Sequence, residues 1–116
     1  ASDVYKRQVY INSCCVLYSG NGISIGDDVL ISANCTIAPV NHEYTNRSKK
    51  ISCQGHASSK GGVIIEDNVW IGSNTVILDG SHICSGTVIA AGSLVREKCE
   101  SNRVFGGNPL REIKKI

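Results

Sequence analysis

Histidine and cysteine are the residues of this chain best suited to chemistry, and the sequence contains three histidines and six cysteines. An imidazole takes up and releases a proton near neutral pH, so a histidine is the first candidate for a general base. His42 and His56 lie in one polar segment, and polar loops on rigid scaffolds commonly carry binding and catalytic groups. His42 is therefore either a base or a surface histidine hydrogen-bonded to the backbone. His56 and His82 are expected to be solvated.

The cysteines predict neither a zinc site nor a disulfide framework. No two of them form a CxxC pair, and none lies in a recognisable nucleophile motif with a base and an orienting group. Free cysteine commonly behaves as a small buried hydrophobe, so we interpret these residues as structural thiols and expect no metal. The six are Cys14, Cys15, Cys35, Cys53, Cys84 and Cys99.

A repeat of six residues runs from Val63 to Cys99. An aliphatic residue recurs at every sixth position, and a small or β-branched residue follows four places after each. This period fits neither an amphipathic helix nor a half-buried strand, and it predicts a parallel β-helix in which three hexads close a coil of about 18 residues. The aliphatic positions, which should point inward, are Ile65, Ile71, Ile77, Ile83, Ile89 and Val95, and the small corner positions are Val69, Thr75, Ser81, Thr87, Ser93 and Cys99.

The repeat extends towards the N-terminus with one shift of phase. Tyr5, Ile11 and Leu17 keep the spacing, and it resumes at Ile25 after an insertion at 20–22. We expect one domain over 1–116, with a loop at 41–62 and a C-terminal segment at 100–116. The chain begins without methionine, and we expect its first coil to lack an N-terminal helical cap. Apolar residues spaced by three in the terminal segment predict a short helix on the last coil: Leu110, Ile113 and Ile116.

Charge and hydropathy exclude several classes of function. The chain has 12 basic and 10 acidic residues, a formal net charge of +2, and this balance argues against a nucleic-acid partner. No apolar run approaches the roughly 18 residues that would span a bilayer, and no segment has the order of a signal peptide. We therefore expect a cytoplasmic protein without membrane insertion.

Two runs carry a resemblance to a known family. The run NVWIGSNTVILDGSHICSGTVIAAGSLV and the later FGGNPLREIKK resemble the hexapeptide-repeat O-acetyltransferases, which include galactoside, maltose, nodulation-factor and capsular or lipopolysaccharide sugar acetyltransferases. The resemblance covers nearly the whole chain from Ile11. It implies an all-β, left-handed parallel β-helix, a homotrimer, a sugar or glycan acceptor, and acetyl coenzyme A (acetyl-CoA) as co-substrate in the groove between neighbouring prisms.

The resemblance also implies roles for individual residues. His42 matches the catalytic base, although Glu43 follows it where the family often has proline. Asn12 and Trp70 match residues of the acceptor cleft, and an acidic partner of the asparagine is replaced by Gly20. The matching coenzyme positions are Ser73 and Ala91 for the pantetheine arm and Arg111 and Lys114 for the phosphates. Where the family commonly has Thr-Lys, this chain has Arg96-Glu97 followed by Lys98, and Arg96 and Lys98 are expected to supply the charge instead.

The reaction implied is direct attack of an acceptor hydroxyl on the thioester, without a covalent enzyme intermediate. Two alternatives stay open at this point. A γ-class carbonic anhydrase would need three histidines converging on zinc, and a non-catalytic β-helix module would need no loop histidine. The acceptor itself depends on loop residues 43–60 and on the neighbouring chain, which a sixfold repeat does not determine.

Overall fold

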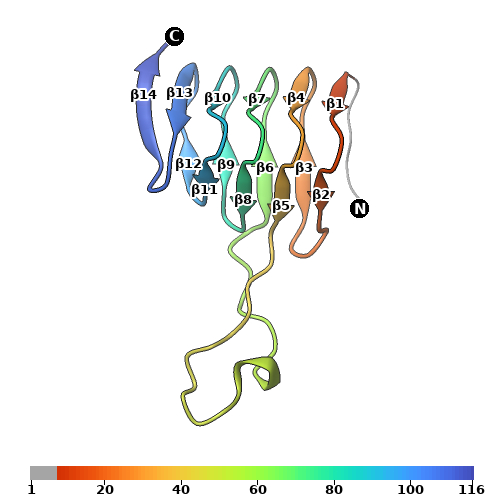
Figure 1. Cartoon of the computed structure of the whole chain (residues 1–116), viewed down its shortest axis with the longest axis vertical. Helices are drawn as coiled ribbons and strands as arrows, with labels where there is room; N and C mark the ends of the chain where they lie inside the picture. Colours follow the sequence, from red (N-terminus) through yellow and green to blue (C-terminus); the bar gives the residue numbers. More distant parts are fainter. Residues whose placement is uncertain (1–7) are drawn as a thin grey trace.

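The chain folds as three faces of short strands around a common core, in a computed structural model that describes residues 8–116 (Figure 1). Tyr5, expected to point inward, lies outside the described residues. Face 1 contains β1 (Val9–Ile11), β4 (Val29–Ile31), β7 (Trp70–Ile71), β10 (Val88–Ile89), β13 (Arg103–Gly106) and β14 (Arg111–Lys115). Face 2 contains β2 (Val16–Leu17), β5 (Thr36–Ala38), β8 (Val76–Leu78) and β11 (Leu94–Val95). Face 3 contains β3 (Ile23–Ile25), β6 (Val63–Ile65), β9 (His82–Ile83) and β12 (Lys98–Cys99).

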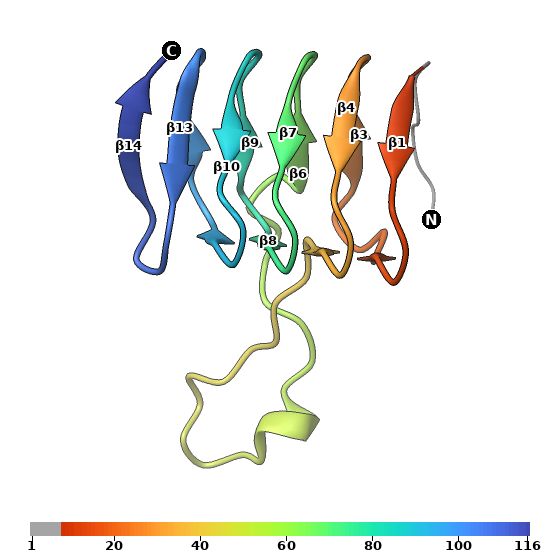
Figure 2. The ribbon, with the colours of Figure 1, turned by 45° about the horizontal axis from the view of Figure 1, so that its top comes forward.

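Within each coil the chain visits faces 1, 2 and 3 in turn, and successive coils lie side by side across the view, from β1 to β13 (Figure 2). Three edges join the faces. We call the edge between faces 1 and 2 the groove edge, the edge between faces 2 and 3 the loop edge, and the edge between faces 3 and 1 the third edge. Apart from the antiparallel pair β13–β14, the paired strands run parallel, as the repeat predicts.

The core confirms the sixfold pattern. All six aliphatic positions from Ile65 to Val95 are at most 1 % exposed, and the six small positions are at most 2 % exposed. Each buried isoleucine or valine removes enough apolar surface from water to contribute about 1.5–3 kcal/mol, so the column inside the coils is the main source of stability. The smaller side chains at the corners allow three chain segments to approach without leaving voids.

Glycine is required at the corners for two different reasons, backbone conformation and lack of space. Gly80, Gly86 and Gly92 have positive φ, as expected for glycines that relieve a turn. Gly72 has ordinary φ and is required by space instead, because a Cβ there would lie 2.5 Å from the backbone nitrogen of Ala91. Other corners place a non-glycine residue in the left-handed region: Cys14, Asp28, Asn34, Asn68, Asn74 and Asn102.

Two departures from the 18-residue coil are visible in the strand register. Val9 pairs with Val29, 20 residues later, which confirms the two-residue insertion predicted at 20–22. Ile83 pairs with Cys99, only 16 residues later, because the last coil is two residues shorter between β11 and β12. The prediction that Cys99 occupies a small corner position is therefore wrong: it fills the aliphatic position of the last coil.

The predicted C-terminal helix is also wrong. Residues Arg111–Lys115 form β14, which pairs antiparallel with β13. A helix of two turns is marginal by itself, whereas the last strand of a stack offers a row of unpaired N–H and C=O groups. Pairing with β13 satisfies those groups, and the charged residues of β14 then form the outer edge. The 3₁₀ turn η1 (Ile51–Cys53) is the only helical element in residues 8–116, and no helix there is long and apolar enough to cross a membrane.

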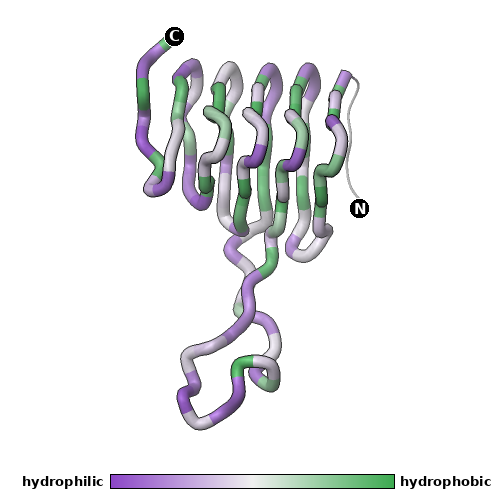
Figure 3. The backbone as a smooth tube through the Cα atoms, in the orientation of Figure 1, coloured by the Kyte–Doolittle hydropathy of each residue, from purple (hydrophilic) through white to green (hydrophobic). Residues whose placement is uncertain are grey.

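A long excursion leaves the loop edge after β5 and returns at β6 (Figure 1). It projects away from the coils and is largely hydrophilic, in contrast to the alternating pattern along the strands (Figure 3). Its strand-free span, residues 39–62, includes the predicted loop at 41–62.

Candidate active site

A hollow of about 480 Å³ lies at the root of the loop, on the loop edge of the first two coils. His42 is exposed at this hollow, where a substrate can reach its imidazole. Both arms of the loop and the corner after β2 contribute to the wall, so the site forms only when the loop returns to the coils. The lining residues are Tyr18, Ser19, Gly20, Ala38, Val40, His42 and His56.

The two arms of the loop form a short antiparallel ladder that brings His42 and His56 together. The backbone of the two histidines forms a β-bridge, and their ring centroids are 4.9 Å apart with an interplanar angle of 31°. The N–H of Glu43 donates to the Gly55 carbonyl at 2.9 Å, and the N–H of Ala57 donates to the Asn41 carbonyl at 2.8 Å. His56 is exposed, as expected, but this ladder also fixes it beside His42. Thirteen residues lie between the two histidines, and no periodic signal in the sequence connects them.

Asp79 anchors the returning arm of the loop to the coils. This carboxylate is only 3 % exposed. Its Oδ1 accepts the N–H of Gly62 at 2.8 Å, and its Oδ2 accepts the N–H of Lys60 at 2.8 Å and the side-chain amide of Asn21 at 3.2 Å. A buried carboxylate is tolerated only when such donors replace water. Asp79 thus ties together the corner insertion, the loop and the third coil, a role that sequence reasoning missed.

Glycine at position 62 allows this anchor to form. Gly62 has φ of +81°, and a Cβ there would lie 2.5 Å from the Gly22 carbonyl oxygen and 2.6 Å from that of Asn21. The carbonyl oxygen of Gly62 also accepts a hydrogen bond from the N–H of Gly80 at 2.8 Å. The loop therefore returns to the coils through a contact that leaves no space for a side chain.

Glu43 orders the distal loop immediately after the candidate base. Its Oε1 accepts the N–H of Tyr44 and the N–H of Thr45, both at 2.9 Å, and the Thr45 hydroxyl at 2.7 Å. The Thr45 N–H, then the Thr45 hydroxyl and the Tyr44 N–H, lower the pKa of the Glu43 carboxyl below its ordinary value. Glu43 stands where the family often has proline, and its side chain stabilises a local turn at Tyr44 and Thr45.

A second hollow, about 400 Å³, lies on face 1 and the groove edge. It brings together three predicted site residues, Trp70, Ser73 and Ala91. The Trp70 ring is 52 % exposed, as expected, and its Nε1 donates to the Ser32 hydroxyl at 3.2 Å. The walls are otherwise small or aliphatic, which suits a narrow extended ligand. The lining residues are Ser32, Trp70, Gly72, Ser73, Val88, Ile89, Ala90, Ala91 and Val104.

Asn12 lies on the same groove edge, one coil before Ser32. Its N–H donates to the Ile31 carbonyl at 2.9 Å, and its side-chain amide donates to the same oxygen at 3.4 Å. Because Ile11 pairs with Ile31, Asn12 continues the column that leads to the second hollow.

The predicted phosphate-binding residues divide between two edges. Arg111 pairs with Gly106, and Lys114 pairs with Val104, which lines the second hollow. Arg96 lies at the corner between β11 and β12 and Lys98 lies on β12, so both belong to the loop edge and face 3. The structure therefore does not bring the four basic residues together within one chain.

The two hollows lie at opposite ends of face 2. Ser73 stands where the chain enters this face, and Gly80 stands where the chain leaves it. Seven residues at about 3.3 Å each span roughly 20 Å, whereas proton transfer requires a base within about 3 Å of the hydroxyl. His42 and the Ser73–Ala91 groove therefore do not meet within one chain.

Three of the six cysteines are buried, as expected for structural thiols, whereas Cys14 and Cys53 are exposed. All six lie in the described part of the chain and are free. Burial raises the pKa of Cys35, Cys84 and Cys99, in the last case to about 12. A thiol with a raised pKa is a poor nucleophile at neutral pH.

His82 does not join the other two histidines. It lies on β9 and its Nε2 contacts Glu66 Oε2 at 2.5 Å, so the expectation that it is simply solvated is wrong. This bond is the main cause of a lowered pKa at the Glu66 carboxyl. The three-histidine zinc set of a γ-class carbonic anhydrase is therefore not assembled within this chain.

Comparison with known proteins agrees with the repeat and the fold. Residues 62–97 match the family model described as bacterial transferase hexapeptide (six repeats), and residues 12–39 match the hexapeptide repeat of succinyl-transferase. The galactoside O-acetyltransferase of Escherichia coli (strain K12) is 35 % identical over 114 residues, which cover 95 % of this chain and 52 % of that protein. The putative lipopolysaccharide biosynthesis O-acetyl transferase of the same strain is 30 % identical over 116 residues, with 96 % and 59 % covered.

Solved structures share the fold. A hexapeptide-repeat acetyltransferase from Vibrio cholerae O1 biovar eltor, complexed with acetyl-CoA, superposes with a TM-score of 0.83 at 32 % identity and covers 92 % of this chain and 56 % of its own. A maltose O-acetyltransferase from Clostridium difficile 630 has a TM-score of 0.75 at 32 % identity, with 96 % and 67 % covered.

The repeat, the parallel faces and these relatives define an acyltransferase-type β-helix, and they fit its left-handed form. The chain belongs to the hexapeptide-repeat acetyltransferase family. It spans about half the length of the curated relatives it matches.

Proposed function

We propose that this protein is an acetyl-CoA-dependent O-acetyltransferase that acetylates a hydroxyl of a sugar or glycan precursor. The observation that carries the proposal is His42, exposed at a hollow on a loop root that Asp79 and the His42–His56 bridge hold against the coils. Relatives named as galactoside and maltose O-acetyltransferases support the class of acceptor.

In the proposed reaction the imidazole of His42 removes the proton of the acceptor hydroxyl as its oxygen attacks the thioester carbonyl carbon. Backbone N–H groups at the cleft stabilise the oxyanion. When the C–S bond breaks, the acetyl group stays on the acceptor oxygen, and the coenzyme leaves as a thiolate that takes the proton from the imidazolium. Transfer is direct, and the raised pKa values of the buried thiols agree with a mechanism that does not use an acyl-cysteine.

A cyclic homotrimer would complete the site. The interface of a ring is heterologous, so it joins one surface of a chain to a different surface of the next. Such an interface would bring the loop edge of one chain, with His42, against the groove edge of its neighbour, with Ser73 and Ala91. Face 1 also exposes a column of large apolar side chains in register, which supports self-association: Tyr10, Leu30 and Trp70, at 59 %, 48 % and 52 % exposure.

The same arrangement supports the coenzyme assignment. An extended ligand along the groove edge would pass Ser73 and Ala91 and reach Arg111 two strand spacings beyond β10, about 10 Å further. Arg96 and Lys98 of the adjacent chain would then approach the phosphates from its loop edge, and their positive charges would attract the phosphate groups. Acceptor contacts are assigned to Asn12 and Trp70.

We also propose that the protein works in the cytoplasm. Six free cysteines are typical of a reducing compartment, in which thiols stay unpaired.

The proposal is tested by following coenzyme A release from acetyl-CoA with a panel of sugars, nucleotide sugars and glycan precursors. His42→Ala should lower the turnover number with the best acceptor by roughly two to four powers of ten and leave coenzyme binding nearly unchanged. Glu43→Gln, next to the base but outside the hollow's lining, is the matched control and should retain most of the activity. Wild-type turnover in His42→Ala would disprove the base. The absence of transfer with every acceptor would favour a non-catalytic β-helix module.

A further inference from the structure

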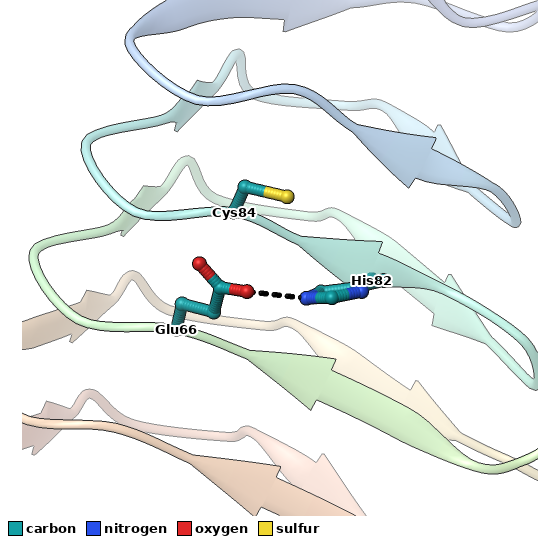
Figure 4. Close-up of side chains that lie close together, drawn as sticks. All are labelled: Glu66, His82 and Cys84. Atoms are coloured by element: carbon teal, nitrogen blue, oxygen red, sulfur yellow. Dashed lines mark hydrogen bonds and ion pairs between the residues drawn. The ribbon is translucent and has the colours of Figure 1, made fainter.

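The third edge holds a cluster that the proposed reaction does not use: Glu66, His82 and Cys84 (Figure 4). One ligand atom from each residue, a carboxylate oxygen, an imidazole nitrogen and the thiol sulfur, lies within 4.8 Å of the other two. Glu66 follows β6, His82 lies on β9, and Cys84 follows β9. Because Ile65 pairs with Ile83, the corner residues Glu66 and Cys84 are stacked on successive coils.

The carboxylate of Glu66 is already oriented. Its Oε2 contacts His82 Nε2 at 2.5 Å, and its Oε1 accepts the N–H of Ser85 at 3.0 Å and the Ser85 hydroxyl at 3.2 Å. Hydrogen bonds of this kind to the far side of a ligand fix its direction and are typical of metal sites in proteins. The hydrogen bond between His82 and Glu66 joins the two atoms that would face a cation.

The cluster is also accessible from one side. The side chains of His82 and Glu66 are 33 % and 38 % exposed, whereas Cys84 is 6 % exposed and forms the inner wall. A cation could enter between the first two and reach the sulfur. Of the neighbouring charged residues on the next coil, Glu100 favours a cation and Lys98 opposes it; both act electrostatically on the Cys84 thiol.

One thiolate, one imidazole and one carboxylate form a mixed ligand set that suits a borderline-soft divalent ion. Zinc binds these atoms at about 2.0–2.3 Å, which places tetrahedral ligand atoms about 3.3–3.8 Å apart. The longest separation, up to 4.8 Å, exceeds that spacing by about 1 Å, and the 2.5 Å contact between His82 and Glu66 is about 1 Å shorter than it; side-chain rotation can supply both movements. A fourth position would remain for water.

We propose that Glu66, His82 and Cys84 form a binding site for Zn²⁺ or a similar divalent ion that links two successive coils. On binding, the Cys84 thiol proton passes to the buffer, the hydrogen bond between His82 and Glu66 is replaced by their bonds to the ion, and the neutral imidazole binds through its unprotonated nitrogen. The site lies on the third edge, whereas the two hollows lie at the ends of face 2, so acetyl transfer would proceed without the ion. A ligand that binds only the folded chain raises its melting temperature, so the expected role is stabilisation.

The test uses metal-free, phosphine-reduced protein in which the exposed thiols are removed by Cys14→Ser and Cys53→Ser. Titration with Co²⁺ should produce a thiolate-to-cobalt charge-transfer band and tetrahedral d–d bands that saturate at one ion per chain, and Zn²⁺ should abolish them. Cys84→Ser should remove the charge-transfer band. Each of His82→Gln and Glu66→Gln should weaken Zn²⁺ binding by at least about tenfold, the lower limit for changes even in the outer shell of a metal site.

His56→Gln is the matched histidine control, and it should bind Co²⁺ and Zn²⁺ like the parent. Circular dichroism establishes that each variant is folded, and the two partly exposed positions, 82 and 66, keep the test valid if the change at Cys84 disturbs the core. Zn²⁺ should raise the melting temperature of the parent but not of Glu66→Gln. Absence of the charge-transfer band in the folded parent, or its persistence in Cys84→Ser, would show that the cluster is only a hydrogen-bonded pair beside a buried thiol.

Discussion

Asp79→Ala should loosen the loop root without disturbing the coil core. The change removes both acceptor oxygens, so the N–H groups of Gly62 and Lys60 and the amide of Asn21 lose their partner. Lys60 is exposed and can bond water, whereas Gly62 is buried. One dry, unpaired donor costs about 1–3 kcal/mol, and we expect a total loss of about 2–3 kcal/mol. At about 4 °C per kcal/mol, the melting temperature should fall by roughly 8–12 °C.

The conservative Asp79→Asn should cost less. An asparagine keeps one acceptor for Gly62, and Asn21 can turn its carbonyl towards the new amide, so only the Lys60 contact is lost. We expect about 1 kcal/mol for this variant. Asp67→Ala is the matched control, because Asp67 accepts a single backbone N–H, from Asp27 at 2.7 Å, on the third edge.

Calorimetry and amide hydrogen exchange together decide this prediction. In Asp79→Ala the amides of residues 57–62 should exchange faster, and acetyl transfer should fall because His42 loses its fixed position. In Asp67→Ala the amide exchange of residues 57–62 and the rate of acetyl transfer should both stay at the wild-type level. If Asp79→Ala melts within about 1 °C of wild type, far less than the 8–12 °C expected from the lost bonds, and exchanges normally at 57–62, the carboxylate does not anchor the loop.

Three further outcomes are expected. Ala91→Tyr should fold with nearly unchanged stability, because Ala91 is exposed and a bulky ring costs little on a surface. The same ring would block the groove, so calorimetric titration should show acetyl-CoA binding well over tenfold weaker than in wild type. Equal affinity would place the coenzyme elsewhere. A thiol reagent at pH 8 should modify exposed Cys53 quickly and leave Cys99 unmodified until denaturation, because burial raises the pKa of Cys99 to about 12; rapid reaction of both would contradict the buried position. The hydrogen bonds to Glu43 lower the pKa of its carboxyl, so they should remain intact at and above the ordinary value near pH 4.3 and break only as the pH falls through the lowered pKa. In an NMR titration the chemical shift of the Thr45 amide should change at that lowered pKa, and in Glu43→Gln this change should be absent.

The regular part of the fold is predictable because its signal is local and repeated. Ile65, Ile71 and Ile77 each occupy the same environment, so the period alone determines which side chains are buried. The C-terminal segment lacks this redundancy: the spacing of Leu110 and Ile113 suits a helix, but the open edge of β13 decides the outcome. That edge is a tertiary feature, and a short amphipathic pattern does not reveal it.

The site is only partly predictable for a similar reason. His42 can be proposed from its place in the loop, and Trp70 from its outward position. The contact of His42 with His56 depends on how the loop folds back, which no repeat encodes. By contrast, the pair of Glu66 and His82 follows from the 18-residue register, since Ile64 pairs with His82, and the sequence held that signal.

The central claim is that His42 acts on a coenzyme held in the groove of a neighbouring chain. Two impaired variants, His42→Ala and Ala91→Tyr, test it when they are unfolded together, refolded in equal amounts and assayed for acetyl transfer at an acetyl-CoA concentration that fills only the intact groove. Random assembly of a ring would pair an intact His42 with an intact groove at about a quarter of the interfaces. We predict that the mixture recovers about a quarter of wild-type activity, while each variant refolded alone stays inactive. A mixture as inactive as its components would contradict a site shared between chains.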